Sequence, residues 1–531
     1  MIVRLYSGSI SGVDAYPVEV EVAFVRQGLP GFSLVGLAET EVREARDRVL
    51  AALRAADFKL PPGRVTVNLA PAGQRKTGTG YDLPLALGLL AASGAIAPER
   101  LEGLYFSGEL SLSGDLRPVR GILPLAILAR QQNAAGLVLP PANAAEAAVV
   151  EGLAVHAPTS LAQCVAFLCG QVSLPLPSVP DSPTAAQTPS PDFAEVKGQQ
   201  GAKRALEIAA AGGHNILMCG PPGSGKTMLA QRLPGILPPL SFEEALEVTK
   251  IYSVAGLLPS AGGLMRQRPF RSPHHTVSDV ALVGGGRQPR PGEVSLAHRG
   301  VLFLDELPEY GKAALESLRQ PLEDGRLSIA RAAGSVTYPA ACMLVAAMNP
   351  CPCGYLGDAA HTCTCRPEQI QRYRARLSGP LLDRIDVQIE VPAVPCADLQ
   401  AISQSRDGEY ASERMRQRVM AARTIQENRY KGTGITCNAA LGGTLLDAHC
   451  ALDRAGASLL EAAMQRLGLS ARAYTRILRL ARTVADMAAS PQIRQEHLAE
   501  AIALRSLDRT GSTVASHPPT LSDRRPLRHR G

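Results

Sequence analysis

Residues 215–227 read NILMCGPPGSGKT, and this stretch decides the fold class of the chain. An apolar run comes first, a glycine-rich loop follows, and a helical pattern beginning MLAQRL comes next. A G-x-x-x-x-G-K-[ST] segment between a strand and a helix is a phosphate-binding loop, because small residues let backbone N–H groups approach phosphate oxygens. Its place between a strand and a helix argues against a chance glycine-rich turn.

The residues of this loop have separate expected tasks. We expect Lys226 to reach the β- and γ-phosphate oxygens of a bound nucleotide and Thr227 to offer its hydroxyl to Mg²⁺. The rest of the loop is expected to line the phosphates: Gly220, Pro221, Pro222, Gly223, Ser224 and Gly225.

Apolar runs and helical patterns continue to alternate after the loop. This alternation predicts a parallel sheet with helices on both faces. The run VLFLDE (301–306) ends in Asp305, expected to hold Mg²⁺, and Glu306, expected to orient or deprotonate the attacking water. The run ACMLVAAMNP (341–350) places Asn349 to touch the γ-phosphate or that water. Taken alone, a helix cap at Asp305 and a turn at Asn349 remain alternatives.

Two arginines further along are candidates for the same nucleotide. Arg384 lies in SGPLLDRID (378–386) between two aspartates, which fits either a surface ion pair or an arginine finger for a neighbouring subunit's ATP. Arg472 begins the helical stretch ARAYTRILRL and is placed to cover the nucleotide from above. From the residues alone both assignments stay open.

Several segments together resemble the magnesium-chelatase-like AAA+ proteins of the ComM/YifB family. The resemblance rests on VKGQQGAKRALEIAAAGGHNILMCGPPGSGKTMLA (196–230), RSPHHTVSDVALVGGG (271–286), GVLFLDELPEY (300–310), LRQPLEDG (318–325), NPCPCGY (349–355) and SGPLLDRID (378–386). It extends to about Arg505. It implies that Asn349 is sensor 1, Arg384 the arginine finger and Arg472 sensor 2. It also implies that the adenine pocket is lined by Val196, Gly198 and Gln199.

The resemblance further implies an activity and partners. Members of this family are expected to use ATP and Mg²⁺, to form rings that are usually hexameric, and to act as DNA helicases driving branch migration during natural transformation. Two rivals share the motor core: a chelatase motor subunit that inserts Mg²⁺ into a porphyrin, and a protein-remodelling AAA+ ATPase. The N-terminal domain and a cysteine insert favour the DNA motor.

In the N-terminal part of the chain, PVEVEVAFVR (17–26) alternates like a half-buried strand, and VTVNLA (65–70) predicts another strand. ETEVREARDRVLAALRAADF (39–58) has helical spacing with a charged face, and the block ending in YDLPLALGLLAASG (81–94) predicts a buried helix.

This N-terminal part is similar to the Lon-protease and ribosomal S5-like fold. The matching segments are NLAPAGQRKTGTGYDLPLALGLL (68–90) and GELSLSGDLRPVRGILPLAILAR (108–130). A Lon-type site needs a serine nucleophile and a lysine base, but these positions fall on Gly80 and Leu123. We therefore expect a non-catalytic binding or ring-organising domain, with Arg75 and Lys76 on an exposed turn.

The whole chain of 531 residues is thus expected to be an α/β protein with three folded domains. The expected divisions are a Lon-protease/S5-like α+β domain (1–172), a Pro-, Ser- and Thr-rich linker (173–191), an AAA+ parallel-sheet core (192–395), a C-terminal helical lid (396–506) and a disordered basic tail (507–531).

Four of the eleven cysteines are clustered in an insert at 351–365. Cys351, Cys353, Cys363 and Cys365 form C-x-C-x9-C-x-C. Four thiolates suit tetrahedral Zn²⁺, and the insert is too short and polar to fold on its own core. Because C-x-C is tighter than the usual C-x-x-C, free thiols or a redox pair remain alternatives.

The net charge of +7 is unevenly distributed. Residues 1–190 carry a net −2, residues 191–400 a net +1 and residues 401–531 a net +8. In related AAA+ helicases a hairpin and an insertion project into the ring channel. Here 326–340 reads as such a hairpin with Arg331 near its tip, and 268–292 fits the insertion. DNA contacts there would be sequence-independent and salt-sensitive.

No segment reads as a signal peptide, and the longest apolar run, residues 83–97, is too short to span a bilayer. Scattered cysteines are not a secreted disulfide framework. We therefore expect a cytoplasmic protein with no membrane partner.

Overall fold

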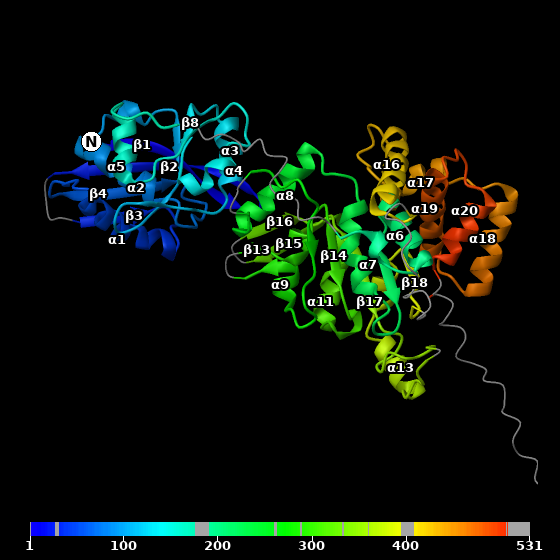
Figure 1. Ribbon diagram of the computed structural model, residues 1–531. Coiled ribbons are helices and arrows are strands. Elements are labelled where there is room, and N and C mark those ends of the chain that lie inside the picture. The colour runs from blue at the N-terminus through cyan, green and yellow to red at the C-terminus, as the bar shows by residue number, and fades with distance from the viewer. Residues whose placement is uncertain are drawn as a thin grey trace, which may run out of the picture. The chain divides into compact units, whose positions relative to one another are not determined.

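The computed structural model describes residues 2–26, 31–175, 191–259, 263–286, 289–331, 334–358, 360–394, 408–505 and 507. The chain forms two compact units (Figure 1). Unit 1 comprises Met1–Ser190, Pro239–Leu302 and Tyr310–Cys342, and unit 2 comprises Pro191–Pro238, Phe303–Glu309 and Met343–Gly531. Most of the expected linker, most of the basic tail and the expected start of the lid (396–407) lie outside the described residues.

The N-terminal part of unit 1 is built on a seven-stranded mixed sheet of order β3-β4-β2-β1-β5-β8-β9. The alternating run predicted as a strand at 17–26 forms β2, which pairs antiparallel with β1 from Ile2↔Ala23 to Ser11↔Asp14. Alternation places every second side chain in the core, among them Val18, Val20 and Val22. The strands are β1 (Ile2–Ser11), β2 (Asp14–Val25), β3 (Gly31–Val35), β4 (Arg64–Ala70), β5 (Leu104–Phe106), β8 (Gly136–Val138) and β9 (Ala154–His156).

Helices cover this sheet. The predicted amphipathic helix at 39–58 is α1 (Thr40–Ala55), and the predicted buried helix is α2 (Asp82–Ser93). α2 packs on β1 and β2 and is covered by α1, so nearly all its residues are buried and its sequence is apolar on every face. The remaining elements of this part are β6 (Glu109–Leu110), β7 (Leu116–Arg117), α3 (Ile122–Gln131), α4 (Ala144–Ala147) and α5 (Leu161–Leu168).

One expectation for this part is wrong. Lys76 was expected on an exposed turn, but its side chain is fully buried and donates to the carbonyls of Pro71 and Gln74. Burial lowers the pKa of Lys76. Of these two basic residues, only Arg75 is exposed, and its side chain pairs with Glu39 at 3.5 Å. Backbone carbonyls supplied by the turn itself offset the cost of burying the ammonium group.

The rest of unit 1 is formed by segments that follow the phosphate loop in sequence. The predicted hairpin at 326–340 is confirmed: β15 and β16 pair from Arg326↔Pro339 to Arg331↔Gly334. Arg331 ends β15, but its side chain lies outside the described residues. The elements are α8 (Phe242–Ala255), β11 (Phe270–Arg271), α9 (Asp279–Val283), β12 (Gly284–Gly285), β13 (Arg290–Pro291), α10 (Glu293–Leu296), α11 (Lys312–Ser317), α12 (Arg319–Asp324), β15 (Arg326–Arg331) and β16 (Gly334–Pro339).

Unit 1 also holds a buried contact between α8 and the N-terminal part. The Glu146 carboxylate accepts from the Leu123 backbone N–H at 2.8 Å, from the Asn143 amide at 3.2 Å and from the Ser253 hydroxyl of α8. Desolvation raises the pKa of Glu146, although these hydrogen bonds oppose the rise. Every polar partner of this buried acid is therefore provided, as burial requires.

Unit 2 carries the predicted parallel sheet. Its buried strands follow the order β14-β17-β10-β18, with Ile216 of β10 opposite Val345 of β17 and Val387 of β18. β14 crosses the division between the units at Phe303. The elements are α6 (Gln200–Gly212), β10 (Ile216–Cys219), α7 (Lys226–Arg232), β14 (Val301–Leu304), β17 (Met343–Met348), α13 (Pro367–Arg374), α14 (Gly379–Leu382) and β18 (Val387–Glu390).

The C-terminal part of unit 2 is helical among the described residues, as predicted. α19 is its central helix and packs on α6, α16 and α20 (Figure 1). The helices are α16 (Ser412–Arg429), α17 (Gly443–His449), α18 (Arg454–Leu467), α19 (Ala471–Met487) and α20 (Gln495–Ala503). Across the described part of the chain, no helix combines the length and the apolar character needed to cross a membrane.

Candidate active site

The phosphate-binding loop lies in unit 2 between β10 and α7. Gly223 and Gly225 have φ of 77° and 88°, a left-handed conformation that other residues adopt only with strain. Gly220 is required for a different reason: a Cβ there would lie 2.1 Å from the Val391 carbonyl oxygen. Gly223 and Gly225 are therefore required by backbone conformation, and Gly220 is required by a close approach to Val391.

Lys226 begins α7 and folds back over its own loop. Its Nζ donates to the carbonyls of Gly220 at 2.7 Å and Pro221 at 2.9 Å, and lies 3.4 Å from Asn349 Oδ1. Burial lowers the pKa of Lys226, while the nearby charge of Asp305 opposes this. The contact to Asn349 joins the loop to the end of β17.

Thr227 and Asp305 meet at the end of β14. The Thr227 hydroxyl donates to Asp305 Oδ2 at 2.7 Å, so the two expected Mg²⁺ ligands are in direct contact. The next residue, Glu306, has φ of 52° although it is not glycine. Such strained residues cluster at functional sites, where the surrounding structure holds them in place.

Of the three residues expected around adenine, Gln199 contacts the phosphate loop. Gln199 also has a left-handed backbone, with φ of 55°, and its amide donates to the carbonyls of Ser224 at 3.1 Å and Pro392 at 2.7 Å. Gly198 has φ of 63°, and Val196 is 5% exposed. Gln199 thus connects the segment before α6 to the phosphate loop and to the end of β18.

Each of the two candidate arginines contacts a residue of the segment 380–383. Arg384 is half-buried and donates to the Pro380 carbonyl at 2.6 Å. Arg472, at the start of α19, lies 3.3 Å from Asp383. The structure therefore joins sensor candidate Arg472 to the segment that carries Arg384, while the contacts above join Lys226, Thr227, Asp305 and Asn349.

The four cysteines of the insert come together. Their sulfurs lie within 4.8 Å of one another, and no histidine, aspartate or glutamate among the described residues joins the group. Sγ of Cys351 lies 3.3 Å from that of Cys353 and 3.7 Å from that of Cys363. Backbone N–H groups of Tyr355 and Thr364 lower the pKa of Cys353 to about 5. Four sulfurs in one small volume suit a tetrahedral metal ion.

The cluster is tied to the phosphate loop by a close backbone approach. Cys351 is fully buried and is separated from Asn349 by one residue. Gly354, with φ of 87°, packs so near Pro222 of the loop that a Cβ would lie 2.6 Å from the proline Cδ. The cysteine insert therefore adjoins Asn349 in the chain and also packs against the phosphate loop.

The fold and these contacts define a P-loop ATPase of the AAA+ class. Family profiles described as "Subunit ChlI of Mg-chelatase", "Magnesium chelatase, subunit ChlI" and "Magnesium chelatase, subunit ChlI C-terminal" match residues 18–143, 192–399 and 409–505. The chain is 46% identical over 511 residues to competence protein ComM of Haemophilus influenzae, covering 95% of this chain and 97% of that protein. It is 45% identical over 498 residues to YifB of Salmonella typhimurium, covering 94% and 96%. It therefore belongs to the ComM/YifB family of magnesium-chelatase-like AAA+ proteins.

A partial similarity connects the chain to proteases. It is 30% identical over 149 residues to Lon protease 2 of Bacillus subtilis, covering 25% of this chain and 26% of that protein. In the structure Leu123 is fully buried in α3, and Gly80 carries no nucleophile.

The family implies ATP and Mg²⁺, and the residues present fit both. The Thr227 hydroxyl and the Asp305 carboxylate are hard oxygen donors of the kind that Mg²⁺ prefers. The glycine conformations and the Lys226 ammonium suit the phosphates. This set of residues would hold a Mg²⁺-nucleotide.

Sequence reasoning missed two groups near the site. One is Gly354, whose role depends on a contact with Pro222. The other is Arg476, which pairs with the buried Asp386. Arg476 follows Arg472 by four residues, so both arginines lie on one face of a helix. This spacing could have identified Arg476 from the sequence.

Proposed function

We propose that this protein is an ATP-hydrolysing, ring-forming DNA motor, a helicase that promotes branch migration of recombination intermediates in natural transformation. The likeness to competence protein ComM over nearly the whole of both chains carries this proposal. The direct contacts among loop, β14 and β17 support ATP hydrolysis as its source of energy.

Each site residue has a role in this proposal. Lys226 binds the β- and γ-phosphate oxygens, Thr227 and Asp305 hold Mg²⁺, and Asn349 contacts the γ-phosphate or the attacking water. Glu306 orients or deprotonates that water, and its strained backbone supports a fixed orientation. When bound, Mg²⁺ neutralises charge that develops on the phosphate oxygens.

Further roles concern the nucleotide's other contacts. Val196, Gly198 and Gln199 line adenine, and Arg472 acts as sensor 2. Arg384 serves the ATP of a neighbouring subunit in a hexameric ring. Such a trans contact requires an assembled ring, which is why the finger need not reach the loop of its own chain.

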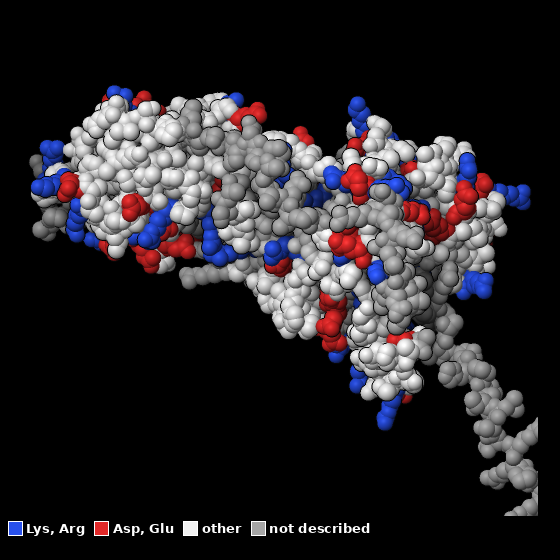
Figure 2. Space-filling model, in the orientation of Figure 1, with Lys and Arg blue, Asp and Glu red and all other residues white. Residues whose placement is uncertain are grey.

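DNA contact is assigned to the β15–β16 hairpin with Arg331 and to the insertion at 268–292. Figure 2 shows basic and acidic side chains intermixed on the displayed face, without one continuous basic stripe. That distribution favours a local contact over a broad basic surface.

We also propose that Cys351, Cys353, Cys363 and Cys365 bind Zn²⁺ in a reducing cytoplasm. The converging sulfurs support this. Metal analysis of purified protein is expected to find about one zinc per chain. Less than about a tenth of an equivalent would contradict the zinc site.

Unwinding of a labelled three-strand DNA junction tests the motor. Wild-type protein is expected to unwind it with ATP, and Glu306→Gln is expected to bind ATP while hydrolysis falls by about 10²–10⁴-fold, because the water loses its base. Glu316→Gln, a surface change on α11, is the control. Intact unwinding by Glu306→Gln would refute the assignment of hydrolysis to this site.

The same assay set separates the rivals. A chelatase motor would respond to a porphyrin-binding partner, and a remodelling ATPase to unfolded protein. ATPase activity that rises with either of these and not with forked DNA would replace the proposal.

A further inference from the structure

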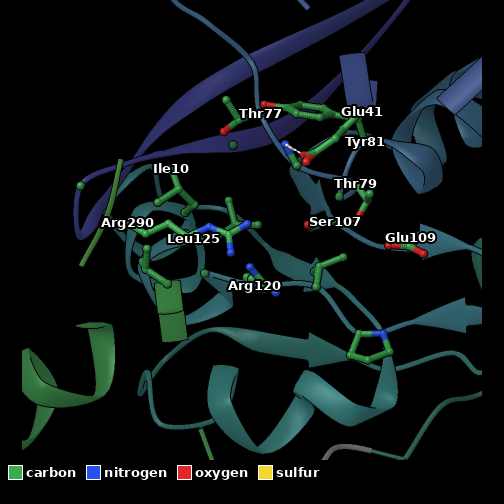
Figure 3. Close-up of a pocket in the computed structure, with 18 of the residues that line it drawn as sticks. Ile10, Glu41, Thr77, Thr79, Tyr81, Ser107, Glu109, Arg120, Leu125 and Arg290 are labelled. Carbon is green, nitrogen blue, oxygen red and sulfur yellow. Dashed lines mark hydrogen bonds between the residues drawn. The ribbon is translucent and has the colours of Figure 1, made fainter. Parts of the chain in front are cut away.

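Unit 1 contains a cavity far in sequence from the phosphate loop. Its volume is about 470 Å³, within the range of small-molecule sites (Figure 3). One wall is the turn 77–81 before α2, another is the segment 118–121 before α3, and Arg290 and Tyr338 complete it from β13 and β16. None of these residues belongs to the nucleotide site.

Two glycines in the walls of this cavity leave space that a side chain would fill. A Cβ on Gly80 would lie 2.6 Å from the Ser107 hydroxyl oxygen, so any side chain there would cover Ser107. A Cβ on Gly121, whose φ is 75°, would lie 2.7 Å from Ile10. The shape of the cavity therefore depends on the absence of side chains at these two positions.

Ser107 lies on the cavity wall with an unused hydroxyl. The residue is 6% exposed, and its hydroxyl makes no hydrogen bond to any residue that the structure describes. The hydroxyl oxygen is therefore open to the cavity, where it can donate or accept a hydrogen bond. A ligand in the cavity would provide its partner.

Two cations point into the same space. Arg120 and Arg290 extend into the cavity (Figure 3), and neither forms an ion pair with a described residue. Elsewhere in unit 1 arginines meet carboxylates through two nitrogens, as Arg48 does with Asp82 and Arg271 with Glu293. A guanidinium group presents several fixed donors that match the oxygens of phosphate or carboxylate.

The acidic side chains of the cavity lie apart from the arginines. Glu41 accepts the Gly78 backbone N–H at 3.2 Å and is held at the turn. In Figure 3, Glu109 is drawn on the other side of Ser107 from Arg120 and Arg290. The cavity thus offers two cationic donors and, apart from them, two carboxylate acceptors.

We propose that this cavity binds a small molecule that carries an oxyanion and, elsewhere on the molecule, hydrogen-bond donors. Arg120 and Arg290 hold the phosphate or carboxylate, and the Ser107 hydroxyl donates to it. Glu41 and Glu109 accept from hydroxyl or amino groups of the same ligand. This site is separate from the proposed motor function and does not depend on it.

Calorimetric titration of the full-length protein tests the site. Saturating Mg·ADP occupies the phosphate loop, so that added anions report on the cavity alone. Ribose 5-phosphate and L-glutamate, at matched ionic strength, distinguish a phosphate ester from an amino-bearing carboxylate. At least one is expected to bind with a Kd of about 1 mM or tighter.

The variants locate the binding. Arg120→Gln and Arg290→Gln are each expected to weaken it at least about tenfold, because a charge-assisted contact is lost. Gly80→Ala should also abolish it by covering Ser107, without any change in charge. Arg100→Gln, an exposed arginine outside the cavity, is the matched control and should bind like wild type.

Two results would overturn the proposal. One is that neither probe binds the wild-type protein at about 10 mM. The other is that the Arg120→Gln, Arg290→Gln and Gly80→Ala variants, shown by circular dichroism to be folded, bind a probe as tightly as wild type does.

Discussion

At the scale of single residues, Gly354 brings the cysteine insert into contact with the phosphate loop. It follows Cys353 in the cysteine insert, and its backbone lies against Pro222 of the phosphate loop. Its φ of 87° excludes most side chains, but Gly357 in the same insert has a similar φ of 81° with open space around it. The two glycines share the backbone requirement, and only Gly354 has the close contact.

This pair gives a controlled test. Gly354→Ala is expected to weaken ATP binding about tenfold, because a methyl group must displace Pro222 and with it the phosphate loop. Gly357→Ala carries the same backbone strain and should leave affinity unchanged. Titration with a fluorescent ATP analogue measures both. Equal affinities in the two variants would show that the contact with Pro222 does not matter.

At the scale of elements, buried hydrogen bonds and an ion pair connect α19 to the segment that carries Arg384. Arg476 pairs with Asp386, whose other oxygen lies 3.0 Å from His214 Nδ1. His214 Nε2 in turn lies 2.8 Å from Thr483 Oγ1 of α19. Burial alone raises the pKa of Asp386, but the His214 hydrogen bond and the Arg476 charge lower it overall. The helix and the finger segment therefore share one buried polar network.

Removing Arg476 should expose the strength of this network. Arg476→Met leaves a nearly buried carboxylate without its cation, and we expect a loss of about 3 kcal/mol in the free energy of unfolding. Arg494→Gln breaks only the exposed pair with Glu496 and should cost less than about 1 kcal/mol. Urea unfolding compares the two. Similar losses would contradict the special role of the buried pair.

The same network has a pH signature. Because the pKa of Asp386 in the folded protein lies below its ordinary value of 3.8, its stabilising contribution is complete above that value and is lost as the pH falls further.

At the scale of the whole molecule, the candidate finger Arg384 and the residues of the phosphate loop make hydrogen bonds to different parts of the chain. The finger candidate Arg384 donates to the Pro380 carbonyl of its own segment. Thr227 contacts Asp305, and Lys226 donates to carbonyls of its own loop. If subunits share ATP sites, the phosphate-loop half and the finger half of one site can come from different chains.

Mixing variants tests this arrangement. Lys226→Ala and Arg384→Ala are each expected to lose ATPase activity, but an equal mixture should recover about a quarter of the wild-type rate, because that share of random interfaces has one intact half from each chain. Steady-state hydrolysis measures it. No recovery, in mixtures shown by native mass spectrometry to exchange subunits, would argue against a finger acting between subunits.

Local pattern predicted much of the fold. The strands at 17–26 and 65–70, the amphipathic helix at 39–58, the hairpin at 326–340 and the parallel sheet are all confirmed. These features follow from side-chain periodicity and glycine placement. Both act over a few residues, so a short stretch of sequence is enough to detect them. The expected domain limits and the roles of individual site residues remain predictions.

The sequence by itself determined the class of chemistry, because a phosphate loop and strand-end acids are local motifs whose residue types already state their ligands. Only the tertiary structure decided which distant groups meet. It buries Lys76, sets Gly354 against Pro222, and brings Ser107, Arg120 and Arg290 to one cavity. Such contacts depend on how whole elements pack and on which side chains are absent between them, and no local spacing encodes either property.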